Sequence, residues 1–278
     1  MVAFHPPVAP LFVPASRPDR FGKADTSGTD AVILDLEDAV VVADKERARD
    51  AVVAGSCKLS SATIVRINAA GTPWHAADLD AVRRLEGICI MLPKAENPQD
   101  IVNLKSRLGR DVPVIALVET ALGLSRLPDI LTADNVVMAA FGSVDFSLDI
   151  GCAHDRLALL AARSELVWRS RAAGHAAPLD GVTTNLSDST ATQEDARHAA
   201  ELGFGGKMAV HPNQVEPILR SFLPCAAQVE WARKVLSVAS TGEALKVDGE
   251  MVDRPVLERA RKILGRADLP SASQVVGN

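Results

Sequence analysis

Polar side chains that could do chemistry stand at the ends of short apolar runs in this sequence. They include carboxylates, two cations, an amide and an imidazole: Asp35, Glu37, Asp38, Arg66, Asn68, Lys94, Glu119, Asp145, Asp180 and His211. Carboxylates without a Cys/His zinc set favour a hard, oxygen-coordinated cation such as Mg²⁺. Glu119 and Asp145 are the candidate ligands.

A bound Mg²⁺ can polarise a carbonyl and stabilise an enolate, and the planar guanidinium of Arg66 can bind a carboxylate. Together these groups predict carbon–carbon bond cleavage or formation next to a carbonyl. The prediction requires these side chains to lie close together in the fold, because a single charged residue at a strand end often has no role beyond contact with solvent. The secondary-structure elements must therefore bring the polar ends of the apolar runs together.

Eight short apolar, β-branched runs supply such elements. They cover residues 10–15, 30–37, 62–68, 87–94, 112–119, 135–142, 176–183 and 206–212. Their nearly continuous apolar content is typical of parallel strands that are covered on both faces. We therefore predict eight buried strands.

Segments with helical spacing alternate with these runs. Start signals stand at Asp44, at Asn97-Pro98 and at Ser189. Eight strand–helix units in about 210 residues match an α/β fold of the (β/α)8 (TIM) barrel type, in which strand ends meet at one mouth. A doubly wound open sheet has the same alternation and is the structural alternative.

The pattern changes after Pro212. Helical segments are expected at 214–222, 226–237 and 255–265, with a polar stretch at 241–253 and no further strand–helix cycle. We predict a catalytic barrel domain over residues 1–212 and a C-terminal helical extension over 213–278. The extension either packs on the barrel or reaches a neighbouring subunit.

Composition excludes several classes. The chain has 278 residues, 47% of them apolar, and a net charge of −5, which gives no general reason to expect nucleic acid or an anionic membrane as a partner. Its four cysteines have no zinc or disulfide spacing. No basic and apolar leader or membrane-length apolar run is present. These features predict a soluble cytoplasmic protein.

Several motifs, in this order, carry a family resemblance. They are LFVP at 11–14, LDLEDAV at 34–40, VRIN at 65–68, MLPKAE at 91–96, ALVETA at 116–121, FGSVDF at 141–146, GGKMAVHPNQ at 205–214 and GEMVDRP at 249–255. The set resembles the citrate lyase beta-subunit-like branch of the HpcH/HpaI aldolase family. It covers residues 10 to about 265.

The resemblance implies a barrel with a C-terminal helical extension, often assembled into homotrimers, and Mg²⁺-dependent lyase chemistry on malyl-, citramalyl- or citryl-type coenzyme A thioesters. It implies that Glu119 and Asp145 bind Mg²⁺, with Glu119 also at the substrate. Further matches are Arg66 to the substrate carboxylate or enolate, Lys23 to coenzyme A, and Val210 and His211 to the acyl region. Asp253 matches an acid/base residue that the extension brings to a barrel mouth, expected to be a neighbour's.

Two departures from the family pattern matter. Val144 stands where a glutamate usually precedes the second metal ligand, which removes a carboxylate near Asp145. The chain has no tyrosine, and Phe12 stands where some relatives have one. Metal affinity or substrate preference is therefore expected to differ from that of relatives.

Other interpretations stay open. The chain could be a free 2-oxo acid aldolase of the same family, a citrate lyase subunit that depends on acyl carrier protein, or a non-catalytic carboxylate sensor. Glu37 and Asp38 could support the metal through water or orient Lys94 and Arg66. His211 could be structural, and Lys23, near Arg17 and Arg20, could lie on a solvated helix face. The sequence does not identify the acyl group of the substrate.

Overall fold

The structure is a computed structural model that describes residues 4–239, 246–247 and 250–267. The chain divides into two compact units, Met1–Leu219 and Arg220–Asn278. The boundary falls inside helix α10 (Val215–Phe222), a few residues after the end expected for the barrel domain. Each unit has a core of its own.

The first unit is built on an eight-stranded parallel sheet in the order β1-β2-β3-β4-β5-β6-β7-β8. The strands are β1 (Leu11–Pro14), β2 (Ala31–Asp35), β3 (Ala62–Arg66), β4 (Ile88–Leu92), β5 (Val114–Val118), β6 (Val136–Phe141), β7 (Leu179–Asp180) and β8 (Gly206–Lys207). Each lies inside one of the eight predicted runs. Every strand neighbours the next one in sequence, which excludes the doubly wound alternative, whose strand order reverses at a switch point.

Backbone hydrogen bonds also join β8 to a residue before β1, and β1 to a residue after β8. The N–H of Lys207 donates to the carbonyl of Val8, and the N–H of Phe12 donates to the carbonyl of Ala209, both at 2.8 Å. Leu11 and Ala209 form a parallel bridge. The residues that follow β8 therefore lie directly beside β1.

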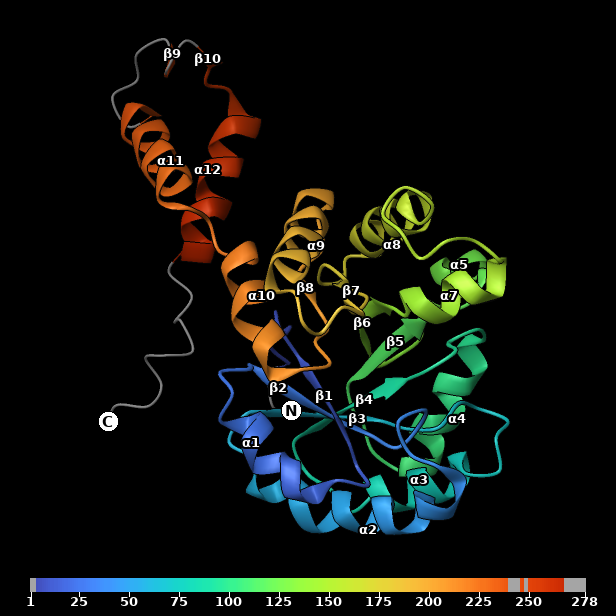
Figure 1. Ribbon diagram of the computed structural model, residues 1–278. Helices are drawn as coiled ribbons and strands as arrows, with labels where there is room; N and C mark the ends of the chain where they lie inside the picture. Colours follow the sequence, from blue (N-terminus) through green and yellow to red (C-terminus); the bar gives the residue numbers. More distant parts are fainter. Residues whose placement is uncertain (1–3, 240–245, 248–249, 268–278) are drawn as a thin grey trace. The chain divides into compact units, whose positions relative to one another are not determined.

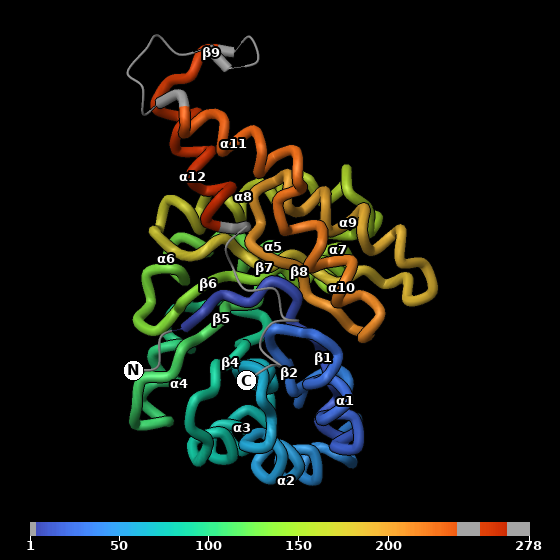
Figure 2. Tube along the Cα trace, turned by 90° about the vertical axis from the view of Figure 1, so that its left-hand side faces the viewer, coloured from blue at the N-terminus to red at the C-terminus, as the bar shows by residue number. Residues whose placement is uncertain are grey.

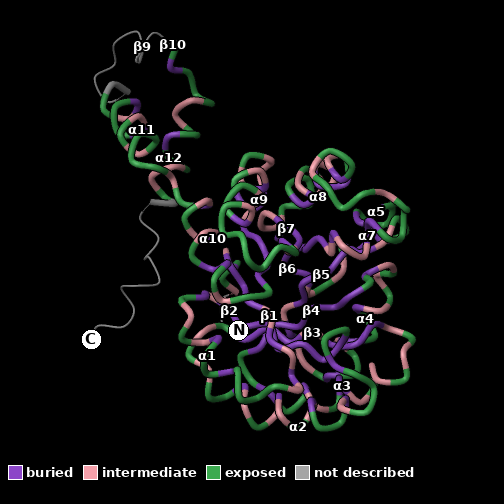
Figure 3. The backbone as a smooth tube through the Cα atoms, viewed as in Figure 1, coloured by how far each residue is buried: buried purple, intermediate pink, exposed green. Residues whose placement is uncertain are grey.

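The strands are buried on both faces, as the continuous apolar runs predict. Alternate residues of the strands meet in an inner core: Ala31, Ile33, Ile64, Cys89, Met91, Ile115, Leu117, Met138, Ala140, Leu179 and Met208. Residues of the opposite parity, such as Val32 and Leu34, are equally inaccessible to solvent. Figure 3 shows buried strands and helices whose outer sides are exposed. Burial on both faces is what a parallel sheet under helices requires.

Helices follow the strands and lie outside them (Figure 1). They are α1 (Phe21–Asp25), α2 (Lys45–Gly55), α3 (His75–Val82), α4 (Pro98–Leu108), α5 (Ala121–Ser125), α6 (Leu127–Leu131), α7 (Ser143–Ile150), α8 (Leu160–Ala172) and α9 (Ser189–Leu202). Single 3-10 turns are η1 (Pro18–Arg20), η2 (Val42–Asp44), η3 (Ser56–Lys58) and η4 (Pro212–Gln214).

Two of the three helix start signals mark the residue before a helix. The side chain of Asn97 caps α4 by accepting the N–H of Gln99, and α2 begins directly after Asp44, although that side chain makes no capping bond. In α9 the cap is Asp188 rather than Ser189, because its carboxylate accepts the N–H groups of Thr190 and Ala191. A carboxylate that satisfies two free donors is a good N-cap.

The second unit consists of α11 (Ala226–Ala239) and α12 (Arg254–Ala267), which lie side by side in both ribbon and tube views (Figures 1 and 2). Its small core contains Ala232, Val235, Val252 and Ala260, with Trp231 packed against it. Two short antiparallel strands, β9 (Lys246–Val247) and β10 (Glu250–Met251), lie within the polar stretch at 241–253. Part of the expected extension lies outside the described residues.

Two further features concern membrane-spanning helices and the cysteines. No helix among the described residues is long and apolar enough to cross a membrane. The four cysteines are all free thiols.

Candidate active site

Arg66, the last residue of β3, lies among carboxylates from the end of β2. Its Nε and Nη2 donate to the two oxygens of Asp35 at 2.7 and 2.8 Å. Its Nη1 lies 3.3 Å from Oε2 of Glu37 and 3.9 Å from Asp38. The ring of Phe12 packs against the guanidinium, with 4.8 Å between Arg66 Cζ and the ring centroid. Burial opposes the charge of Arg66, but Asp35 and Glu37 raise its pKa, so it stays a cation.

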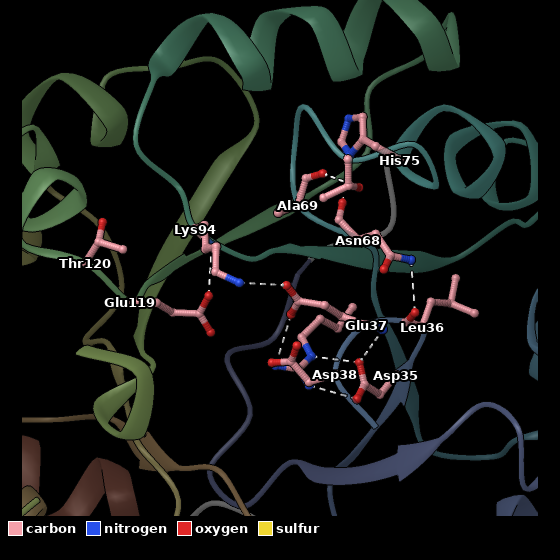
Figure 4. A network of polar contacts seen from close by, with 12 residues as sticks. Asp35, Leu36, Glu37, Asp38, Asn68, Ala69, His75, Lys94, Glu119 and Thr120 are labelled. Atoms are coloured by element: carbon pink, nitrogen blue, oxygen red, sulfur yellow. Dashed lines mark hydrogen bonds and ion pairs between the residues drawn. The ribbon is translucent and has the colours of Figure 1, made fainter. Parts of the chain in front are cut away.

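Lys94 lies between Glu37 and Glu119, as Figure 4 shows. Its Nζ is 3.5 Å from Oε1 of Glu37, and its backbone N–H donates to Oε2 of Glu119 at 3.0 Å. Lys94 follows β4, and Glu119 directly follows β5. Parallel strands thus bring Asp35, Arg66, Lys94 and Glu119 to one edge of the sheet, the edge at which the carboxyl ends of the strands lie.

Glu119 fits this position because residue 142 is glycine. A Cβ at Gly142 would lie 2.3 Å from Cγ of Glu119 and 2.8 Å from its Oε1. Gly142 is the single residue between β6 and α7. Asp145 lies in the first turn of α7. The charge of Asp145 raises the pKa of Glu119, which places these two carboxylates in electrostatic reach of each other.

Two carboxylates at this edge have strongly raised pKa values. Burial raises the pKa of Glu119 to about 8, and the charges of Glu37 and Asp145 add to the effect, while Arg66 opposes it. Burial likewise raises the pKa of Glu37 to about 7. Both carboxylates are almost inaccessible, at 2% and 6% exposure. An anionic oxygen that is held out of water gains most from a nearby cation.

Lys45, on α2, is hydrogen-bonded to the residues that follow β2 and β3 at this edge. Its buried ammonium donates to the carbonyls of Leu36 and Glu37 and to Oδ1 of Asn68, at 2.6 to 2.7 Å. Asn68 in turn donates to the buried Asp78 of α3. These bonds fix the segment after β2, which carries Glu37, to the segment after β3.

The other residues singled out in the sequence lie as follows. Lys23 is exposed on α1. Val210 and His211 follow β8 and are exposed; the N–H of Val210 donates to Gln214, and Nδ1 of His211 accepts the N–H of Asn213. Because residue 209 bonds to β1, these residues stand beside the strand that leads to α1.

Asp253 belongs to the second unit. It precedes α12, is exposed, and its Oδ1 accepts the N–H of Val256 at 3.1 Å.

Asp180 does not join the group at the sheet edge. It is fully buried and forms ion pairs with Arg163 at 2.9 Å and with Lys207 at 3.1 Å. Burial favours the neutral acid, but the two cations lower the pKa of Asp180. The expectation that every polar strand end opens onto one mouth is therefore wrong for the seventh run, where the charge is neutralised between β7, β8 and α8.

Sequence reasoning missed the roles of Asp35, Lys45 and Gly142. The sequence marks Asp35 as the end of an apolar run, but not as the bidentate partner of Arg66. Nothing in the pattern marks Lys45, which resembles an ordinary lysine at a helix start. Gly142 stands beside the predicted ligand Asp145, and a glycine between a strand and a helix was the available signal.

The residues present fit a divalent cation that binds through few protein ligands. No cluster of three or more His, Cys, Asp or Glu among the described residues forms a complete metal cage. Mg²⁺ needs no such cage, because it usually binds through one or two carboxylates plus water and substrate oxygens. Oε2 of Glu37 is buried and, apart from its ion-pair contact with Arg66, has no hydrogen-bond partner. Glu119 and Asp145 supply further ligand oxygens.

Consecutive parallel strands with buried carboxylates and a fixed guanidinium at their carboxyl ends are typical of an α/β enzyme. The comparison with known sequences is more specific. The chain belongs to the HpcH/HpaI aldolase/citrate lyase family, whose sequence model matches residues 9–212. The resemblance noted from the motifs is thereby confirmed, and the chain is an enzyme of the carbon–carbon lyase type.

Individual relatives match over nearly the whole chain. The citrate lyase subunit beta-like protein of Mycobacterium tuberculosis is 38% identical over 265 residues, covering 92% of this chain and 94% of the relative. The (3S)-malyl-CoA thioesterase of Cereibacter sphaeroides is 29% identical over 283 residues, covering 96% and 97%. The crystal structure of CitE from Mycobacterium tuberculosis in complex with magnesium, acetoacetate and coenzyme A matches with a TM-score of 0.83 and 36% identity, covering 94% of this chain and 97% of CitE.

Proposed function

We propose that the chain is a Mg²⁺-dependent carbon–carbon lyase that cleaves or forms a malyl-, citramalyl- or citryl-type thioester of coenzyme A. The observation that carries the proposal is the position of Glu119. It is a buried carboxylate with a raised pKa, within electrostatic reach of Asp145 and at the same sheet edge as Arg66. The similarity to a malyl-CoA thioesterase and to a CitE structure with magnesium, acetoacetate and coenzyme A adds support.

In this proposal Glu119 and Asp145 hold Mg²⁺, and Glu119 also borders the substrate. When bound, the ion supplies a Lewis acid that stabilises negative charge on carbonyl oxygens. Arg66 binds the substrate carboxylate or the enolate oxygen. Because its Nε and Nη2 are engaged by Asp35, substrate would bind on the Nη1 side, which lies 3.3 Å from Oε2 of Glu37. Asp35 therefore fixes the orientation of the guanidinium before substrate arrives.

Lys23 binds the coenzyme A part, and Val210 and His211 border the acyl group. The support is their place in the sheet: the bonds between β1 and residue 209 put the segments that carry these residues on neighbouring strand ends. The same bonds support a closed (β/α)8 barrel, with the barrel domain at 1–212 and the helical extension at 213–278.

The extension lies over a neighbouring subunit of a homotrimer and brings Asp253 to that subunit's site. There Asp253 protonates the carbanion of the acyl thioester after cleavage or, in the reverse direction (condensation), removes that proton from the acyl thioester. Asp253 is exposed and precedes α12, outside the first unit. This supports a role at the mouth of an active site rather than in a packed core.

The test is an assay of the purified chain with three substrate sets: malyl-, citramalyl- and citryl-CoA, the same acyl groups on acyl carrier protein, and free 4-hydroxy-2-oxo acids. We expect Mg²⁺-dependent release of an oxo acid and an acyl-CoA, and none in excess chelator. Release of free thiol separates thioester hydrolysis from carbon–carbon cleavage. Activity confined to carrier-protein thioesters would instead indicate a citrate lyase subunit, and activity confined to free hydroxy-oxo acids an aldolase.

A further inference from the structure

Lys94 has an unusual backbone. Among the described residues, only Lys94 and Asn135 combine a side chain with a positive φ, at 47° and 73°. Asparagine tolerates this left-handed region, whereas lysine is disfavoured there. A lysine in this conformation at the edge that carries Arg66 and Glu119 needs surrounding contacts to hold it, and such positions concentrate at functional sites.

The contacts that hold Lys94 come from β5 and from the residue that follows it. The N–H of Lys94 donates to Oε2 of Glu119 at 3.0 Å, and the N–H of Ala95 donates to the carbonyl of Leu117 at 3.1 Å. They fix the backbone without using the side chain. The ammonium is then directed toward Glu37, with 3.5 Å between Nζ and Oε1 (Figure 4).

The ammonium of Lys94 is the more accessible cation of this cluster. The side chain of Arg66 is only 11% exposed and is engaged by Asp35, whereas that of Lys94 is 44% exposed. Its contact with Glu37 is long for an N–H···O bond, so its remaining donors are open to another acceptor.

We propose that Lys94 is a substrate-binding residue whose ammonium binds the carboxylate of the oxo-acid part of the substrate, beside Arg66. The inference rests on the proposed function, because it takes the edge around Glu119 as the reaction centre. An anionic substrate has to approach a group of surrounding carboxylates, and Lys94 is placed to offset that repulsion where the substrate's own negative charge arrives. Its backbone separately orients Glu119, so the two contributions can be separated by substitution.

The test combines Lys94→Asn with a change of ligand charge. Asparagine accepts the left-handed backbone, as Asn135 does, but carries no cation. The probes are pyruvate and its neutral ester methyl pyruvate, titrated into Mg²⁺-loaded full-length protein by calorimetry or ligand-observed NMR. We expect Lys94→Asn to weaken pyruvate binding by about fivefold or more, as for a half-exposed charge-assisted contact. Methyl pyruvate binding should change by less than about twofold, and Lys94→Arg should retain most of the pyruvate affinity.

Lys105→Asn is the matched control. Lys105 has a similar exposure of 40% and a carboxylate partner, Asp111, at 2.9 Å, but it lies on α4 away from the edge. This variant should bind both probes as wild type does. Mg²⁺ affinity is measured for every variant, because a merely structural loss would misplace Glu119 and weaken Mg²⁺ binding, whereas the loss of a carboxylate contact would not.

Equal pyruvate affinity in Lys94→Asn and wild type, or an equal loss for both probes, would overturn the assignment of Lys94. If wild type cleaves the thioesters while Lys94→Asn keeps its kcat and KM, the inference fails and the proposed function stands. If Mg²⁺-loaded wild type binds neither probe and cleaves no thioester, the proposed site fails, and the role of Lys94 fails with it.

Discussion

Gly142 and Glu119 are in such close contact that no side chain fits between them: a Cβ at position 142 would lie 2.3 Å from Cγ of Glu119. Gly142→Ala should therefore displace the Glu119 carboxylate. We expect Mg²⁺ affinity to fall by about tenfold or more, with a loss of roughly 1 to 3 kcal/mol in unfolding free energy from overpacking. Gly265→Ala is the control, because no atom lies within 4 Å of the place its methyl group would take and helices favour alanine. Wild-type Mg²⁺ affinity in Gly142→Ala would contradict the assignment of Glu119.

The bidentate contact between Arg66 and Asp35 predicts that a lysine cannot replace Arg66. Arg66→Lys can restore at most one of the bonds at 2.7 and 2.8 Å, and Asp35 also accepts the N–H groups of Glu37 and Ala39. We expect at least about a tenfold loss in kcat/KM, the equivalent of about 1.5 kcal/mol or more. Arg107→Lys, which breaks a comparable contact with Asp80 on the surface, should leave kinetics unchanged. Equal kinetics for Arg66→Lys and wild type would make Arg66 structural.

Raised carboxylate pKa values predict how Mg²⁺ binding depends on pH. With a pKa of about 8, Glu119 is protonated in the metal-free protein at neutral pH, and a cation has to displace that proton. Mg²⁺ affinity should therefore rise from pH 6 to pH 8 with proton release, by up to tenfold per unit for one proton. Calorimetry in buffers of different ionisation enthalpy measures the released proton. In Glu119→Gln both the affinity and this pH dependence should be lost.

The same pKa shift predicts the stability of the metal-free protein. A carboxyl that binds its proton more tightly when folded stabilises the fold below its ordinary pKa, and this contribution is lost as pH rises toward about 8. Thermal unfolding in chelator should thus show a lower Tm at pH 8 than at pH 6. Added Mg²⁺ should raise the Tm more at pH 8. A larger Mg²⁺ effect at pH 6 would contradict the raised pKa.

Lys45 satisfies three buried acceptors at once, so its loss should affect stability as well as the site. Lys45→Met removes the donor to Leu36, Glu37 and Asn68 and should lower the unfolding free energy by roughly 2 to 4 kcal/mol. Chemical denaturation measures this loss. Lys58→Met, at an exposed position, should stay within about 0.5 kcal/mol of wild type. A Lys45→Met protein as stable as wild type would show that the three acceptors find other donors.

A shared active site can be tested by mixing inactive chains. Asp253→Asn keeps an acceptor for the N–H of Val256 but cannot exchange a proton, so it should bind Mg²⁺ and lose most turnover. Co-refolding it with Glu119→Ala chains should restore part of the activity, because mixed interfaces combine one intact Glu119 with one intact Asp253. Mixed oligomers without activity above either parent would exclude sharing, and normal turnover by Asp253→Asn alone would exclude its acid/base role.

The strands were predictable because their chemistry is local. Burial on both faces demands continuous apolar runs, and each of the eight runs contains a strand. The polar ends of the second to fifth runs meet at one edge for the same reason, since parallel order fixes which ends are neighbours. β7 and β8 are only two residues long, shorter than their runs, because hydrogen-bonding geometry rather than composition ends a strand.

The remaining features depend on distances through space. Asp180 looks like any other polar strand end, and only the proximity of Arg163 and Lys207 turns it into a buried ion pair. Lys45 starts a helix in sequence, but its ammonium lies among carbonyls. The small ribbon of β9 and β10 lies in a polar stretch without alternating apolar residues, so no strand periodicity indicated it.

The separate core of the second unit has a spectroscopic consequence. Tyrosine is absent, so three tryptophans dominate the ultraviolet emission of the protein. Trp231 packs on that core, whereas Trp74 lies beside Lys45 and Trp168 is exposed on α8. With Trp74 and Trp168 replaced by phenylalanine, the remaining emission would report on residues 220–278 only. The protein thus carries its own optical label for melting of the helical pair apart from the sheet.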